Sequence, residues 1–453
     1  MLTGAAAQPP RAASQTWIAL CGGIALELLF YCVYRLGNLE VHVVETIAAG
    51  LAAGTVYFIF LYAFEHLPDS HGAFWVILAA ALLFRITLWP LAPTLSEDLY
   101  RYRWDGRVQV AGWNPYAVRP DDPRLADLRE TQVPHFPGQE NPTIYPPLAE
   151  LVFRLGARYL PSPRAFKLVP AGADVLTLFL LAAWLRKAGG RNYQLAIYAW
   201  NPLVVVEFAA SGHSDALALL ALVSAYVIIR SQPTVSTLAL GCAALFKSFP
   251  MMLFPVWFRR VGSSHWWRGW AAGFAAVVLA VICAWPYRSA FAQVPATLAY
   301  FESHWQDNNA SLYALLRWFS GSHQLAAGAG VGVTAGLALW TAARKVDPVR
   351  AGYLIIGAIL MLTPNAYSWY FTWIVPFLCF IPNVAWLLLT ILQFLSYHVL
   401  INYLAFGRFQ FDHRYVFLTY APSYGWLLWK AAFGSRKEEP ELLGIEPGGA
   451  AGT

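Results

Sequence analysis

Long apolar runs recur from one end of the chain to the other, and they limit the fold more than any other feature. These runs of about 18 to 25 residues are each long enough to cross ~30 Å of hydrocarbon as a helix. Only 12% of the 453 residues are charged, about half the share found in a soluble domain. Such a chain cannot cover a water-facing surface, so we expect an all-α, polytopic membrane helix bundle.

The apolar runs predict about 12 to 14 transmembrane helices. The expected spans are 16–36, 43–64, 73–92, 165–185, 193–210, 213–230, 268–286, 324–343, 350–365, 369–381, 384–404 and 415–431. The apolar stretch 234–258 is interrupted by KSFP at residues 247–250, and it forms either one crossing or two short helices that enter and return. Placing the Lys- and Arg-rich short loops in the cytoplasm favours the second alternative, with both termini inside.

The longest polar segment, residues 93–144, follows the third span and is expected to lie outside. The short amphipathic segment YPPLAELVFRLGARYL comes next and predicts an interfacial helix. The predicted organisation is a cytoplasmic tail (1–15), two N-terminal helices (16–72), a transmembrane module with an external loop at 93–163 (73–290), C-terminal helices (291–431) and a disordered cytoplasmic tail (432–453).

The distribution of positive charge indicates that the partners are membrane lipids and not nucleic acid. The formal net charge of +6 is scattered through short loops, which suits anionic headgroups and lipid phosphates. The five cysteines lie in apolar segments without metal-ligand or disulfide spacing, so we expect all of them to be buried.

The stretch SEDLYRYRWDGRVQVAGWNPY, residues 96–116, concentrates charge directly after the third span. On a helix capped by Ser96, one face would carry Asp98, Arg101, Tyr102 and Asp105. A solvated interfacial helix explains this pattern without any function. The alternative is a reactive site, because an acid at the outer end of a span can meet both a lipid phosphate and a water-soluble substrate.

Five blocks in fixed order resemble a known enzyme family. They are EDLYRYRWDGRVQVAGWNPY, TIYPPLAELVF, AWNPLVVVEFAASGHSDALALL, ALFKSFPMMLFP and TPNAYSWYFTWIVPF, spread over residues 96–380. The chain resembles the GT-C class of polyprenyl-phosphate-mannose-dependent mannosyltransferases, in particular glycosyltransferase family 87. The resemblance implies a GT-C bundle whose module is 73–290, preceded by two extra helices. It also implies a polyprenyl-phosphate sugar donor, a glycan or glycolipid acceptor, and inversion at the anomeric carbon.

The resemblance assigns the catalytic carboxylate of the first external loop to Asp98, as general base. Glu97 and Asp105 are rivals for that role. A departing phosphate requires cations, and the candidates are Lys247, Arg101, Arg103 and Arg107; a membrane-interface anchor is the alternative for Lys247. Candidate contacts to sugar or acceptor are Glu97, Tyr102, Asp105, Asn114, Tyr145, His213, Asp215, His304, Tyr367 and Trp369.

Simpler roles compete for several of these residues. His213 and Asp215 equally fit turn and helix-cap chemistry, and aromatic anchoring at the interface suits Tyr367 and Trp369. Asp174 lies inside a span, where a lone carboxylate is costly, so we expect an ion pair with Arg85 or Lys167.

The predicted function is transfer of a hexose, mannose by resemblance, on the extracytoplasmic face of the bacterial cytoplasmic (inner) membrane. No cofactor and no metal site is predicted, although a divalent metal is left open. The alternative is a transporter or lipid flippase, which often has two similar halves with broken helices in corresponding positions. The sequence has one such broken segment and no evident repeat.

Overall fold

The computed structural model describes residues 13–130, 138–262, 266–304, 308–309, 311–407 and 409–433, and within them the fold is helical without strands. Seven of the described helices are long and apolar enough to cross a membrane. They cover Ser14–Leu36, Val43–Glu65, His71–Leu88, Pro163–Lys187, Trp267–Glu302, His323–Ala343 and Val384–Phe406. Four shorter apolar helices accompany them. The predicted all-α, polytopic bundle is confirmed, and the chain is a multi-pass membrane protein.

The outer surface of the bundle is apolar, as lipid requires. On α13 (Trp266–Ala284) the side chains of Trp270 and Phe274 are 75% and 71% exposed, and on α21 (His413–Phe433) Leu428 is 71% exposed. Exposed apolar surface of this extent marks a membrane contact in a protein of this composition. Cys21 and Cys32 are also exposed on α1 (Ala13–Leu36). The prediction that all five cysteines are buried is therefore wrong for these two, because a lipid-facing position is apolar without being covered by protein. Cys242 is partly buried, and Cys283 and Cys379 are buried as predicted.

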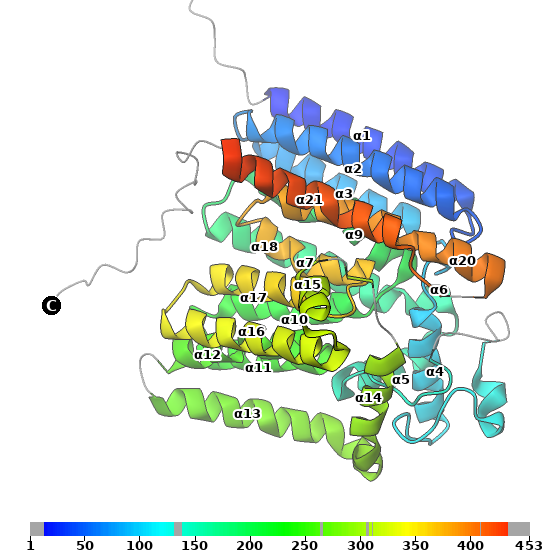
Figure 1. The fold of residues 1–453 in the computed structure, drawn as a ribbon. Helices are drawn as coiled ribbons and strands as arrows, with labels where there is room; N and C mark the ends of the chain where they lie inside the picture. Colours follow the sequence, from blue (N-terminus) through cyan, green and yellow to red (C-terminus); the bar gives the residue numbers. More distant parts are fainter. Residues whose placement is uncertain are drawn as a thin grey trace, which may run out of the picture.

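The N-terminal helices α1, α2 (Val43–Glu65) and α3 (His71–Leu88) lie along one side of the molecule (Figure 1), where α1 packs against both α2 and α3. Most of the bundle shares one hydrophobic core, which extends from Ala19 to Tyr420. The remaining long helices are α7 (Leu168–Lys187), α10 (Asp215–Ile228), α16 (His323–Ala343) and α17 (Pro348–Leu362). Shorter ones are α14 (Val294–His304), α15 (Leu312–Ser320), α19 (Val384–Leu392) and α20 (Val399–Phe406).

The centre of the bundle is an irregular segment in which every residue from 193 to 216 is buried. The expected span 193–210 is instead divided into η2 (Asn192–Leu195), α8 (Ala196–Ala199), α9 (Pro202–Val205) and the π-helix η3 (Val206–Ser211). Pro202 interrupts the helix, and the side chain of Asn201 caps the restart by accepting from the backbone N–H of Leu203 at 3.0 Å. Irregular backbone is tolerated at membrane depth where protein surrounds it.

The same correction applies to the expected span 369–381, which forms the short helices η6 (Ser368–Trp373) and α18 (Val375–Leu378). Segment 234–258 also breaks, as the second alternative predicted. Helix α11 (Pro233–Phe246) ends before Lys247, and η4 (Phe249–Leu253) and α12 (Phe254–Val261) turn back and pack against it. Two prolines, Pro250 and Pro255, prevent one continuous helix.

The polar loop after α3 folds into α4 (Asp98–Val110), η1 (Pro123–Leu128), α5 (Pro147–Tyr159) and α6 (Pro163–Phe166). Helices α4 and α5 lie together with α14 at one end of the bundle (Figure 1). Gly106 permits the close approach of α4 to α5, because a Cβ there would lie 2.2 Å from the backbone oxygen of Phe153. The close contact between α4 and α5 therefore holds α4, which begins at Asp98, at this end of the bundle.

Three charged side chains buried inside the bundle, those of Arg85, Asp174 and Lys167, have hydrogen-bond partners. Arg85 Nε lies 2.6 Å from Asp174 Oδ2, and Tyr198 donates its hydroxyl to the other carboxylate oxygen at 2.6 Å. Of the two predicted partners for Asp174, the structure selects Arg85. The ammonium of Lys167 instead donates to the backbone oxygens of Leu91, Ala209 and Ala210 at 2.7–2.9 Å.

Candidate active site

A cavity of about 1040 Å³ opens between the polar loop and the membrane helices. One wall carries ionisable side chains, including Glu97, Asp98 and Lys247. Residues of α14, α16, α17 and η5 (Trp285–Gln293) also line the cavity, and most of them are apolar: Phe291, Val294, Leu298, Ala327, Val331, Ile359 and Leu362. The cavity therefore combines charged groups with a surface suited to a hydrocarbon chain.

Asp98 is the first residue of α4 and faces this cavity. Its backbone N–H donates to Ser96 Oγ at 3.2 Å, and its carboxylate accepts from the Tyr102 hydroxyl at 3.3 Å. The side chain keeps 32% of its surface exposed because the cavity opens onto it. Burial raises the pKa of the Asp98 carboxyl, while His213 and Lys247 act to lower it. Asp98 is thus an accessible carboxyl with cations nearby.

His213 lies directly behind Asp98 and is almost completely buried. Its Nε2 is 3.9 Å from Asp98 Oδ2, and its Nδ1 is 2.9 Å from Glu207 Oε2. The imidazole also stacks on Trp369, with ring centroids 4.2 Å apart. Glu207 itself accepts a hydrogen bond from the Tyr397 hydroxyl at 2.8 Å. The carboxylates of Asp98 and Glu207 therefore lie on either side of the His213 imidazole.

Lys247, at the break after α11, joins the same cluster. Its Nζ lies 3.1 Å from Asp215 Oδ2, and Trp373 donates to the other oxygen of Asp215 at 2.8 Å. The ammonium also lies 5.1 Å from the ring centre of Tyr370 and 5.9 Å from that of Tyr145. A cation held by an acid and two aromatic rings beside a cavity can bind an anionic group there.

The three candidate arginines are engaged with the loop itself. Arg101 lines the cavity, but its Nε lies 3.1 Å from each carboxylate oxygen of Asp105, and its other nitrogens donate to the backbone oxygens of Gly138 and Asn141. Glu130 accepts from Arg103 at 2.8 Å and pairs with Arg107 at 3.4 Å. Neither Arg103 nor Arg107 lines the cavity.

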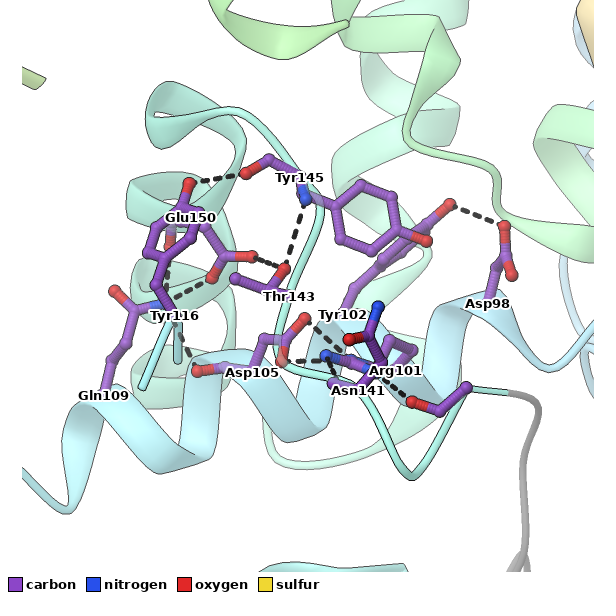
Figure 2. A network of polar contacts seen from close by, with 11 residues as sticks. Asp98, Arg101, Tyr102, Asp105, Gln109, Tyr116, Asn141, Thr143, Tyr145 and Glu150 are labelled. Carbon is purple, nitrogen blue, oxygen red and sulfur yellow. Dashed lines mark hydrogen bonds and ion pairs between the residues drawn. The ribbon is translucent and has the colours of Figure 1, made fainter. Parts of the chain in front are cut away.

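Asp105 belongs to a buried polar network that ties α4 to α5 (Figure 2). Thr143 and Gln109 donate to the two carboxyl oxygens of Glu150, at 2.6 and 2.8 Å. Burial, and then the charge of Asp105, raises the pKa of Glu150 well above its usual range. Asp105 is therefore the anionic partner of Arg101, and Glu150 is the neutral acid beside it. The pair builds the loop and lies away from the cavity, unlike Asp98.

The other predicted contacts divide between the cavity and its surroundings. Glu97, Tyr145, Tyr367 and Trp369 line the cavity. Burial, followed by the charges of Glu40 and Asp98, raises the pKa of Glu97 to about 7. Asn114 instead donates to the Tyr287 backbone oxygen at 3.2 Å and to Ser289 at 3.1 Å, away from the cavity. The side chain of His304 lies outside the described residues.

Glu207 and Glu150 were not among the residues predicted from the sequence. A signal existed for Glu207, since a carboxylate in the apolar run NPLVVVEFAAS is costly without a partner. Glu150 gave no such signal, because acids on interfacial helices are common. Among the described residues, no group of three or more His, Cys, Asp or Glu side chains has the arrangement of a metal site.

Comparison with known proteins identifies the family. Residues 25–260 match the model of the alpha-(1->6)-mannopyranosyltransferase N-terminal domain, which is more than half of the 453 residues. The match begins inside α1, so the two N-terminal helices fall largely within the family's domain. A search of curated proteins and a search of solved structures find no match. The chain therefore belongs to the alpha-(1->6)-mannopyranosyltransferase family and is a mannosyltransferase of the GT-C type.

Proposed function

We propose that this mannosyltransferase takes mannose from a polyprenyl phosphate and transfers it, with inversion, to a glycan or glycolipid acceptor outside the cytoplasmic membrane of a bacterium. The observation that carries the proposal is that Asp98 and Lys247 line one cavity together with many apolar side chains. A polyprenyl-phosphate sugar has a hydrocarbon chain, an anionic phosphate and a sugar, and the cavity offers a matching surface for each part.

In the proposed step, the Asp98 carboxylate accepts the proton of an acceptor hydroxyl. The acceptor oxygen then forms a bond to the anomeric carbon on the face opposite the phosphate. The bond between that carbon and the phosphate oxygen breaks, and its electron pair leaves with the polyprenyl phosphate. Lys247 stabilises the phosphate as its negative charge develops. The family name specifies an α-(1→6) linkage, and an α-linked product with inversion requires a β-linked donor.

Glu97 and the aromatic residues Tyr145, Tyr367 and Trp369 are the proposed contacts to sugar and acceptor, since all four line the cavity. Trp369 is already stacked on His213 and Tyr367, so we assign it hydrogen bonding through its indole N–H, which has no hydrogen-bond partner among the described residues. The arginines of α4 act on the fold of the loop instead of on the phosphate.

The test is mannosyl transfer by the purified protein, with polyprenyl-phosphate mannose and GDP-mannose as competing donors. We expect transfer from the lipid donor alone, and loss of about 10²–10⁴-fold in kcat for Asp98→Asn with donor binding retained. Asp105→Asn is the matched control, because its carboxylate lies on the same helix but off the cavity. Transfer from GDP-mannose, or full turnover by Asp98→Asn, would contradict the proposal.

The orientation is tested separately with a membrane-impermeant thiol reagent and single cysteines introduced at Asp121 and Arg124, two exposed or half-exposed loop positions. We expect labelling in intact spheroplasts. Labelling only after lysis would place the loop in the cytoplasm, away from an extracytoplasmic acceptor.

A further inference from the structure

Glu207 and His213 are buried polar residues next to Asp98 that have no role in the transfer step described above. Glu207 is fully buried, and His213 is 1% exposed. The series Tyr397–Glu207–His213–Asp98 runs from η7 (Gln393–His398) through the bundle centre to the start of α4, with successive side chains 2.8, 2.9 and 3.9 Å apart. A buried carboxylate and imidazole in this arrangement are costly to maintain unless they act on something.

The backbone that carries Glu207 and His213 is itself unusual. Glu207 lies on the π-helix η3, and π-helical turns are rare and frequently occur at functional sites. Gly212 follows with φ +76°, and a Cβ there would come within 2.9 Å of both Leu99 and Lys167. The ammonium of Lys167 holds the backbone oxygens of Ala209 and Ala210. These features turn the chain so that His213, one residue later, faces Asp98.

The imidazole is held on three sides. Glu207 contacts Nδ1, Trp369 stacks on the ring, and Asp98 lies beyond Nε2. With Glu207 beside Nδ1 and Asp98 beyond Nε2, a protonated ring forms an ion pair with each carboxylate. The negative charges of the two carboxylates therefore favour the cationic imidazole.

We infer that Glu207 and His213 are positioning residues, in which Glu207 keeps the imidazole oriented and cationic and the imidazole keeps Asp98 an oriented carboxylate. This inference rests on the proposed role of Asp98 as the base. Neither residue needs to touch substrate, since both act through Asp98. The groups around Asp98 that share its electrostatic environment are His213, Lys247, Asp215, Tyr102, Glu97, Tyr145, Tyr367 and Tyr370.

The test is the pH dependence of kcat for Glu207→Gln and His213→Gln, measured at saturating donor and acceptor. Without a cationic imidazole, Asp98 becomes harder to ionise, so the acid limb of the profile should move to higher pH. We expect a shift of about one unit, which approaches a tenfold extra loss of kcat on the acid side of both limbs, with recovery toward wild type at high pH. The donor KM should be unchanged.

A merely structural role would give a different result. Glu207→Gln preserves side-chain volume, and Tyr397→Phe serves as matched control because it removes a hydrogen bond from the same carboxylate without changing charge. Tyr397→Phe is expected to shift the profile less than Glu207→Gln. A uniform loss at every pH, or profiles that superimpose on wild type, would overturn the inference. Full activity of Asp98→Asn would instead overturn the proposed function itself, so the two failures are distinguishable.

Discussion

The buried pair of Asp105 and Glu150 gives the sharpest test of how the loop is stabilised. Both carboxyl groups are fully buried, and Arg101 is the cation that contacts the pair. Because burial and the charge of Asp105 raise the pKa of Glu150, we assign the negative charge to Asp105 and a proton to Glu150. Replacing each carboxyl by its amide should therefore have unequal effects.

The magnitudes follow from the contacts that each substitution removes. Glu150→Gln keeps a neutral side chain and can still accept from Thr143, so it should cost about 1 kcal/mol, the value of one hydrogen bond. Asp105→Asn removes the anion that faces Arg101, but Glu150 can ionise in its place, so we expect about 1–3 kcal/mol. The double variant leaves no anion beside a buried guanidinium and should cost about 3–5 kcal/mol.

The assay is the free energy of unfolding in mixed detergent micelles, followed by circular dichroism and arranged as a double-mutant cycle. A larger cost for Glu150→Gln than for Asp105→Asn would refute the assignment of the proton to Glu150. The pH dependence gives a second check. A raised pKa in the folded state favours folding at low pH, and that contribution is lost as pH rises above the ordinary value of about 4.5. The advantage of wild type over Glu150→Gln should therefore shrink between pH 5 and pH 8.

Two further predictions concern the cavity and the bundle. Lys247→Met should raise the donor Kd by about 10- to 100-fold, which is the value of a charged hydrogen bond. Arg107→Met removes a cation that does not line the cavity, so it should change the donor Kd far less. Equal effects of the two variants in a donor-binding titration would show that Lys247 does not bind the phosphate. Asp174→Ala leaves Arg85 buried without its anion and should lower the free energy of unfolding by about 3–5 kcal/mol; a loss below 1 kcal/mol in the micelle assay would mean that the guanidinium finds water or another partner.

Local sequence patterns were sufficient for the class of fold and for part of the site. The break at Lys247 was predicted from the KSFP interruption and from the placement of the Lys- and Arg-rich short loops in the cytoplasm, and the helix at Asp98 was predicted from the charge pattern of residues 96–116. Both patterns are visible along the chain without knowledge of tertiary contacts. Because a buried charge is costly, Asp174 was predicted to pair with Arg85 or Lys167, and the structure shows the pair with Arg85.

Patterns along the chain were less informative where tertiary contacts override them. The apolar run 193–210 has the composition of a membrane span, yet it forms short turns because protein surrounds it and can satisfy its backbone. The arginines of α4 had the right charge and position for a phosphate. Their guanidinium groups are occupied by Asp105 and Glu130, and sequence alone does not show which acid an arginine will meet.

The amino-acid sequence by itself determined that this chain is a helical membrane protein with a charged segment directly after its third helix, because hydropathy and charge act locally along the chain. Only the tertiary structure decided which groups surround Asp98. His213, Lys247 and Glu207 lie more than a hundred residues away from it in the sequence. Their convergence depends on how the helices pack, and packing is a property of many distant side chains acting together.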